Sequence, residues 1–134
     1  MWATIRAAIL SIVQAQATKI QNAYRTDRSR FDGTPAAIIT PAESESDYGT
    51  TSTDKRVYVF TIRVHVPIPA EGQDNADIVL EGAIDELLTI FSNKTILGAA
   101  CDWVEPIPSV WGYQDRSDGQ YRIAEMKLRC IKYV

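Results

Sequence analysis

The residues that could carry out chemistry are few. His65 is the only histidine in the chain and alternates with Arg63 near the end of a strand-like run. An acid–base or nucleophilic site needs a base held beside a nucleophile, yet no serine lies in a Gly-x-Ser-x-Gly turn. Cys101 and Cys130 lie in strand-like runs, without the basic setting or helix N-terminus that activates a thiol. We therefore predict no catalytic residue, a structural role for His65 and two buried thiols.

Sites for metals and cofactors have equally little support. The sequence has no Cys-x-x-Cys motif, no paired histidines and no glycine-rich phosphate loop. Glu43-x-Glu45-x-Asp47 and Asp74-x-x-Asp77 offer carboxylate oxygens to a hard cation, but they lack the spacing of a calcium-binding loop. We predict solvated acidic faces there, with no metal and no cofactor.

The composition is that of one ordinary globular domain. The 134 residues are 46% hydrophobic and 23% charged, enough for one core without disulfides or metals, so we treat 1–134 as a single domain. Fourteen Lys and Arg against seventeen Asp and Glu give a net charge of -3, which argues against coating nucleic acid or an anionic membrane. No apolar run approaches the roughly 20 residues needed to cross a bilayer.

Hydrophobic periodicity predicts two helices. Apolar residues recur at three- and four-residue spacing from about Trp2 to Lys19, which favours an amphipathic helix over a secretory signal. A second stripe ends at Phe91 on a helix that Asp74 or Asn75 caps, and its other face is acidic. The charged segment 24–34 between the first helix and the first strand is expected to be a loop.

Period-two alternation predicts about four strands. The expected strands are 36–40, 55–66, 99–113 with a bend at Pro106 and Pro108, and 120–134, with a polar loop at 41–54 and a hairpin turn at Asp118-Gly119. Short links between strands favour antiparallel pairing. We therefore expect an α+β domain in which two helices pack on one face of an about four-stranded antiparallel sheet, in the order α-β-β-α-β-β.

Charge is segregated along the chain. Basic residues cluster at Arg25, Arg28 and Arg30, whereas the segments 41–54 and 67–93 carry acids and no Lys or Arg. Opposite patches on one molecule favour head-to-tail contact between copies, which closes into a ring or continues as a filament. Scattered solvated charge on a monomer is the alternative.

Several short runs resemble one known family. They are Phe31-x-Gly33-x-Pro35-Ala36, Pro41, Glu45-Ser46-Asp47-Tyr48-x-Thr50-Thr51, Arg56-x-Tyr58-x-Phe60-x-Ile62 and Tyr121-Arg122-x-Ala124-Glu125. Together with the order of elements, they resemble the tail-terminator (neck) and minor tail proteins of long-tailed bacteriophages over most of the chain.

The resemblance implies a structural virion protein without an active site. Such subunits form a ring, commonly a hexamer, that caps the tail tube, ends tail polymerisation and joins the tail to the head. The partners would be copies of the chain itself, the tail tube protein and a head-completion or connector protein. DNA would pass through without specific binding, and no membrane would be involved. The ring would be assembled in the host cytoplasm and located in the neck of the virion tail.

Two groups of residues are predicted to make contacts. Charge segregation places Arg25, Arg28 and Arg30 opposite Asp77, Glu81 and Asp85 of an adjacent copy. On the family reading, the loop with Glu43, Glu45, Asp47 and Tyr48 would contact the tube or a neighbour. Trp103 and Trp111 suit either an interface or the core.

Two other functions stay open. One is another head–tail joining or tail-completion subunit. The other is a small monomeric ligand-binding or enzymatic α+β domain that uses His65, Asp47 and Tyr48 near a pocket, because a fold alone does not decide function.

Overall fold

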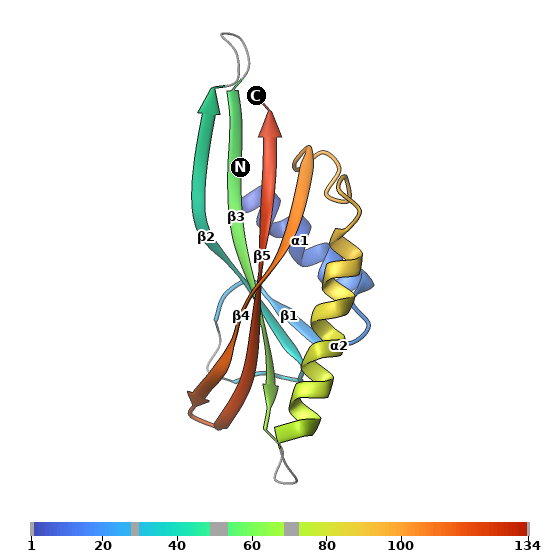
Figure 1. The fold of residues 1–134 in the computed structure, drawn as a ribbon, viewed down its shortest axis with the longest axis vertical. Helices are drawn as coiled ribbons and strands as arrows, with labels where there is room; N and C mark the ends of the chain where they lie inside the picture. Colours follow the sequence, from blue (N-terminus) through green and yellow to red (C-terminus); the bar gives the residue numbers. More distant parts are fainter. Residues whose placement is uncertain (1, 28–29, 49–53, 69–72, 134) are drawn as a thin grey trace.

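The chain folds into a sheet with two helices (Figure 1). The structure, a computed structural model, describes residues 2–27, 30–48, 54–68 and 73–133. In chain order the elements are α1 (Trp2–Gln16), β1 (Asn22–Tyr24), β2 (Ala36–Tyr48), β3 (Asp54–Pro67), α2 (Gln73–Phe91), β4 (Trp103–Arg116) and β5 (Gly119–Tyr133). The β2–β3 pair reaches one end of the long axis, and the turn between β4 and β5 lies at the other end.

The sheet has five strands in the order β1-β2-β3-β5-β4. β1 pairs parallel with β2, and all other neighbours are antiparallel. The predicted fold class was therefore wrong: the sheet is mixed and five-stranded, and the order is α-β-β-β-α-β-β. The extra strand, β1, is only 3 residues long, too short to show a period-two pattern in the sequence.

β2 is much longer than predicted. The strand passes through Pro41 to Tyr48, and its register with β3 shifts between Pro41 and Glu43. Because β1 pairs with β2 only as far as Ile38, Pro41 lies where the strand is an edge, and an edge tolerates proline and a bulge. The loop predicted at 41–54 is therefore wrong for residues 41–48 and 54, which are strand; residues 49–53 lie outside the described part of the chain.

β4 also departs from its prediction. The strand starts at Trp103 instead of Ala99 and runs without interruption to Arg116. Its two prolines, Pro106 and Pro108, pair with Leu128 and Met126 of β5. In place of the predicted bend, the register with β5 shifts between Pro108 and Trp111. The hairpin turn is where the sequence placed it, and Gly119 there has φ +133, a backbone conformation that glycine adopts without strain.

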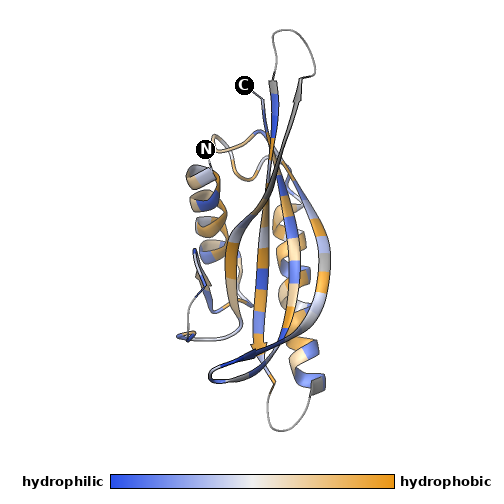
Figure 2. Cartoon of the chain, turned by 90° about the vertical axis from the view of Figure 1, so that its left-hand side faces the viewer, coloured by the Kyte–Doolittle hydropathy of each residue, from blue (hydrophilic) through white to orange (hydrophobic). Residues whose placement is uncertain are grey.

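The core lies between the helices and one face of the sheet, here called the helix face. Ile5 and Ile9 of α1, Leu80 and Leu87 of α2, and Phe60 of β3 are fully buried there. Figure 2 shows the alternation of hydrophobic and hydrophilic positions along the strands that creates this face. Alternation predicts that Ala124, Met126, Leu128, Cys130 and Val134 of the last strand point inward; the first four are buried, and Val134 lies outside the described residues. Each large apolar side chain buried there contributes roughly 1.5–3 kcal/mol.

Helix α1 ends three residues before its predicted end, at Gln16. The turn that follows is fastened to α2, because Glu86 accepts hydrogen bonds from the Thr18 hydroxyl (2.5 Å) and the Lys19 amide (2.8 Å). Although burial opposes it, these hydrogen bonds lower the pKa of Glu86. An acid that the charge pattern left unexplained thus joins the two helices.

Candidate functional site

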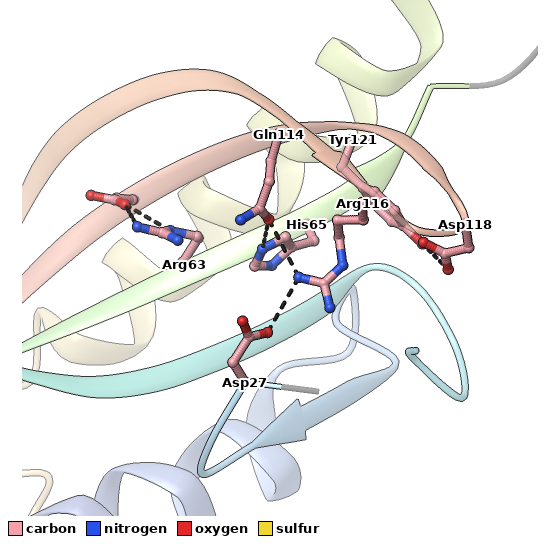
Figure 3. Close-up of polar contacts among 8 residues, drawn as sticks. Asp27, Arg63, His65, Gln114, Arg116, Asp118 and Tyr121 are labelled. Carbon is pink, nitrogen blue, oxygen red and sulfur yellow. Dashed lines mark hydrogen bonds and ion pairs between the residues drawn. The ribbon is translucent and has the colours of Figure 1, made fainter. Parts of the chain in front are cut away.

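The opposite face of the sheet, here called the second face, carries a polar cluster around a buried histidine (Figure 3). His65 of β3 is fully buried, and its Nε2 lies 2.9 Å from Oε1 of Gln114 on β4. Nη1 of Arg116 donates to the same Gln114 oxygen (3.4 Å) and to Oδ1 of Asp27 (3.2 Å). The cluster therefore joins two strands of the sheet to the segment that follows β1.

The environment of His65 favours its neutral form. Burial is the main cause that lowers the pKa of His65, and the positive charges of Arg116 and Arg63 act in the same direction. Hydrogen bonds to Gln114 and to the backbone of Ala36 oppose the change without reversing it. Because Gln114 Oε1 also accepts from Arg116, Nε2 of the neutral imidazole carries the proton.

Phe31 covers this cluster. Its ring lies 5.0 Å from the His65 ring and 5.7 Å from the Tyr121 ring, and it stacks on Tyr24 at 5.8 Å. The Arg116 guanidinium lies 4.4 Å from the centre of the Phe31 ring. Phe31 thus holds the charged segment after β1 against the second face through aromatic contacts with His65 and Tyr121 and a cation–π contact with Arg116.

Tyr121 completes the group on the β5 side. Its hydroxyl donates to Oδ2 of Asp118 at 2.8 Å. Burial, followed by the hydrogen bond and charge of Asp118, raises the pKa of Tyr121, so the phenol stays protonated at neutral pH. The imidazole is neutral and buried, and the phenol is protonated, so neither is poised for catalysis. The cluster, called the structural lock below, instead holds Asp27 and Phe31 of the segment after β1 against the sheet.

A cavity of about 200 Å³ lies beside this lock, lined by Asp27, Ile38, Thr40 and Arg63. Its two charged residues are engaged within the chain: Arg63 Nε donates to Glu125 at 2.7 Å, and Asp27 pairs with Arg116. His65, Asp47 and Tyr48 are grouped for a ligand-binding site by the sequence analysis, and of these His65 belongs to the structural lock beside the cavity. Asp47 pairs with Lys55 in the β2–β3 register, ten positions along β3 from His65, which is roughly 30 Å in a strand.

The residues predicted for contacts between copies lie at different places. Arg25 and Arg30 are exposed, and Arg28 lies outside the described residues. Asp77 has a partner in its own chain, Arg122, whose Nε donates to it at 2.7 Å, whereas Glu81 and Asp85 are exposed on α2. Glu43, Glu45, Asp47 and Tyr48 belong to β2, where their backbones pair with β3, and their side chains lie outside what the structure describes.

Exposed hydrophobic residues that the sequence did not identify lie along β4, with Trp103 and Ile107 on the second face and Trp111 and Tyr113 on the helix face. Of the eight large hydrophobic side chains that are exposed in the described chain, five belong to this strand: Trp103, Ile107, Val110, Trp111 and Tyr113. β4 is the last strand of the sheet, and among the described residues no strand pairs with its outer side. The only available signal was the pair of tryptophans around two prolines, which fits a core equally well.

Arg122 of β5 lies against two of these aromatic rings, those of Trp111 and Tyr113. The Arg122 guanidinium lies 4.5 Å from the Tyr113 ring and 5.4 Å from the Trp111 ring. The same side chain donates to Asp77 of α2 and to the carbonyl of Gly112 (2.9 Å). The rings stay 49% and 39% exposed, so they are fixed in place while open to a partner.

The two cysteines are buried, as predicted. A hydrogen bond with Cys101 and then burial raise the pKa of Cys130 well above its ordinary value, so this thiol stays protonated. No group of three or more His, Cys, Asp or Glu in the described part of the chain is placed to hold a metal ion.

The sequence was compared with protein-family models and with curated proteins. No protein-family model matches the sequence, and no curated protein matches it. Neither of the described helices is long and apolar enough to cross a membrane.

Proposed function

We propose that the chain is a structural subunit that assembles with copies of itself into a tail-terminator ring of a long-tailed bacteriophage. The ring caps the tail tube, ends tail polymerisation and joins the tail to the head. One observation carries the proposal: among the described residues, the two outer strands of the sheet, β2 beyond Ile39 and β4, have no strand on their outer side, and β4 bears five exposed large hydrophobic residues.

Unpaired edges of this length support assembly. An exposed edge is a template for pairing with another chain, and proteins that stay monomeric protect theirs by shortening, charge, proline, bulges or a covering element. Both outer strands here contain proline and a register shift, so the exposed apolar side chains of β4 are the feature that most favours a partner. Two different free edges on opposite sides of one subunit suit head-to-tail contact, which closes into a ring when the rotation between subunits permits. The short runs that resemble tail-terminator proteins, from Phe31 to Glu125, direct the proposal to that class of ring.

The remaining parts of the proposal concern partners. A terminator needs one face that complements the open end of the tail tube and another that a further tube subunit does not fit. The acidic balance of the chain, with a net charge of -3, suits a channel through which DNA passes without being held. The partners are then the tube protein on one side and a head-completion or connector protein on the other.

Electron microscopy of the purified protein, together with its mass in solution, tests the proposal. We expect closed rings with a central hole wide enough for duplex DNA, and a mass that is a multiple of the 14.9 kDa chain, six copies being the family expectation. Open filaments, or single copies at every concentration, would refute the ring.

A further inference from the structure

We propose that Cys101 and Cys130 form a redox-active pair, which a small disulfide oxidant converts to a disulfide within one chain. Both thiols are free, are 1% and 0% exposed, and belong to the core on the helix face. Cys101 lies in the segment 92–102 between α2 and β4, here called the connecting turn, and Cys130 lies in β5. The proposed function uses neither thiol, so the inference goes beyond it.

The backbone holds the two cysteines at neighbouring positions. The Asp102 amide donates to the Ile131 carbonyl at 2.9 Å, and these two residues directly follow the two cysteines in the chain. The Tyr133 amide donates to Oδ2 of Asp102, also at 2.9 Å. Figure 1 shows the connecting turn at the end of the molecule where β5 also ends. Both cysteine side chains therefore enter the core from adjoining pieces of backbone.

The two thiols contact each other, and the contact is unequal. A hydrogen bond joins them; it is the main cause that lowers the pKa of Cys101 and the main cause that raises the pKa of Cys130. Cys101 is thus the thiol that ionises first, with the Cys130 thiol donating to its sulfur. Because the thiolate is the nucleophile in disulfide exchange, Cys101 is the attacking residue and Cys130 the resolving residue.

The reaction proceeds in two exchanges. The Cys101 thiolate attacks one sulfur of the oxidant, so that a mixed disulfide forms, the sulfur–sulfur bond of the oxidant breaks and one thiolate leaves. Cys130 then loses its proton, and its sulfur attacks Sγ of Cys101, which expels the second thiolate. The two leaving thiolates take up the two protons. The chain thus loses two electrons and two protons, and the oxidant gains them as two thiols.

Access to the pair depends on opening of the connecting turn. Cys101 is buried, but Ala99 and Asp102 on its two sides are exposed. Besides the bonds of Asp102, the turn is held to β5 by Nζ of Lys132, which donates to the Ala99 carbonyl at 3.3 Å. A segment with so few bonds to the sheet opens at a lower free energy than a paired strand. We therefore expect slow oxidation that becomes faster in urea below the unfolding transition.

The redox state of the surroundings decides which form prevails. A reducing cytoplasm keeps thiols reduced, whereas disulfides persist in an oxidising medium such as that around a virion. Only this timing rests on the proposed function: the subunit assembles as the dithiol and forms the disulfide after leaving the host. The disulfide fastens the connecting turn to β5 and restricts the unfolded chain, which stabilises the fold.

Oxidation of the purified chain by glutathione disulfide tests the pair. We expect the intact mass to fall by two hydrogen atoms without a glutathione adduct, and peptide mapping to find Cys101 joined to Cys130 of the same chain. In a glutathione redox buffer, the equilibrium constant for oxidation should be at least about tenfold larger for the folded chain than for the urea-unfolded chain. Two free thiols in excess oxidant, glutathione on both cysteines, a disulfide between chains, or an equilibrium constant no larger for the folded chain would each overturn the pair.

Two matched variants test the order of attack. Cys130→Ala should accumulate one glutathione on Cys101 at least about tenfold faster than Cys101→Ala accumulates it on Cys130, because the connecting turn opens more readily than β5. Equal or reversed rates would overturn this order. Circular dichroism establishes that the variants fold, and the measurements on the original chain decide the pair even where a variant does not.

These measurements require no assembly, so their outcome is separate from that of the proposed function. A chain that forms the disulfide but stays monomeric would support the pair and refute the ring. A ring whose thiols stay free in excess oxidant would refute the pair and retain the ring.

Discussion

Arg116 and Arg122 stand near the two ends of the β4–β5 hairpin turn, and each lies on aromatic rings, but on opposite faces of the sheet. Arg116 rests on Phe31 of the covering segment, and its side chain is 8% exposed. Arg122 lies against Trp111 and Tyr113, which are 39% and 49% exposed. An arginine on aromatic rings thus forms a largely buried contact on the second face, called the closed contact, and a half-exposed contact on the helix face, called the open contact.

The difference shows how the environment decides the use of a contact. On the second face, Phe31 lies against His65 and Arg116, and His65 Nε2, Gln114 Oε1 and Asp27 Oδ1 are bonded to one another or to Arg116. That arrangement stabilises the fold. On the helix face, α2 supplies only Asp77 and leaves the rings open. Aromatic area held in place but not covered is typical of binding surfaces.

The closed contact should carry the largest effect on stability. Phe31→Ala removes the ring that contacts His65, Tyr121 and Arg116, and we expect it to lower the free energy of unfolding by about 3 kcal/mol. Urea denaturation of the original chain and the variant measures the loss. Phe31→Leu is the control and should lose less than half as much. An unchanged midpoint for Phe31→Ala would show that the segment does not seal the second face.

The open contact should affect assembly more than folding. Trp111→Ala removes a half-exposed ring, so we expect the free energy of unfolding to change by less than about 1 kcal/mol. Assembly should weaken by about 2 kcal/mol, roughly thirtyfold. Urea denaturation and sedimentation at several concentrations separate the two quantities. If Trp111→Ala destabilised the monomer as much as Phe31→Ala, the two contacts would not differ in the way described.

The buried imidazole should make stability depend on pH. The pKa of His65 is lowered in the folded chain, so below its unfolded value of about 6.5 the unfolded chain binds the additional proton first. Stability from this group is therefore complete above about pH 6.5 and is lost as the pH falls, by no more than about 1.4 kcal/mol per pH unit.

Urea denaturation between pH 5 and 8 measures this loss, and His65→Gln provides the comparison. The difference in unfolding free energy between the original chain and His65→Gln should be flat above about pH 6.5 and shrink below it. A difference that stays constant down to pH 5 would mean that His65 titrates alike in the folded and unfolded chains.

The sequence predicted those parts of the fold whose pattern is local. β3 alternates over most of its length and α2 carries one wide apolar stripe, so both were found within a few residues of their bounds. β1 is too short to show a pattern. The outer half of β2 is polar and is a strand because β3 pairs with it, which no local signal reveals.

The site was harder to predict for the same reason. Phe31 lies in a charged segment, and its role depends on His65 and Tyr121, which are far along the chain and meet it only through the sheet. The exposure of Trp111 follows from β4 being the last strand of the sheet. A tryptophan in an interior strand has the same sequence signature, so strand order decides between core and surface.

The smallest effect should come from the contact between the helices. Glu86 accepts hydrogen bonds from Thr18 and from the Lys19 amide, so Glu86→Gln should cost about 1 kcal/mol at neutral pH. Because the pKa of Glu86 is lowered from 4.5 in the folded chain, its contribution is present above that value and disappears as the pH falls through the folded pKa. Glu81→Gln, at an exposed position of the same helix, is the matched control. Urea denaturation at pH 7 and pH 3 should show a smaller difference between the two variants at pH 3 than at pH 7, and an equal cost for both at pH 7 would mean that Glu86 acts through the charge of α2 and not through the turn after α1.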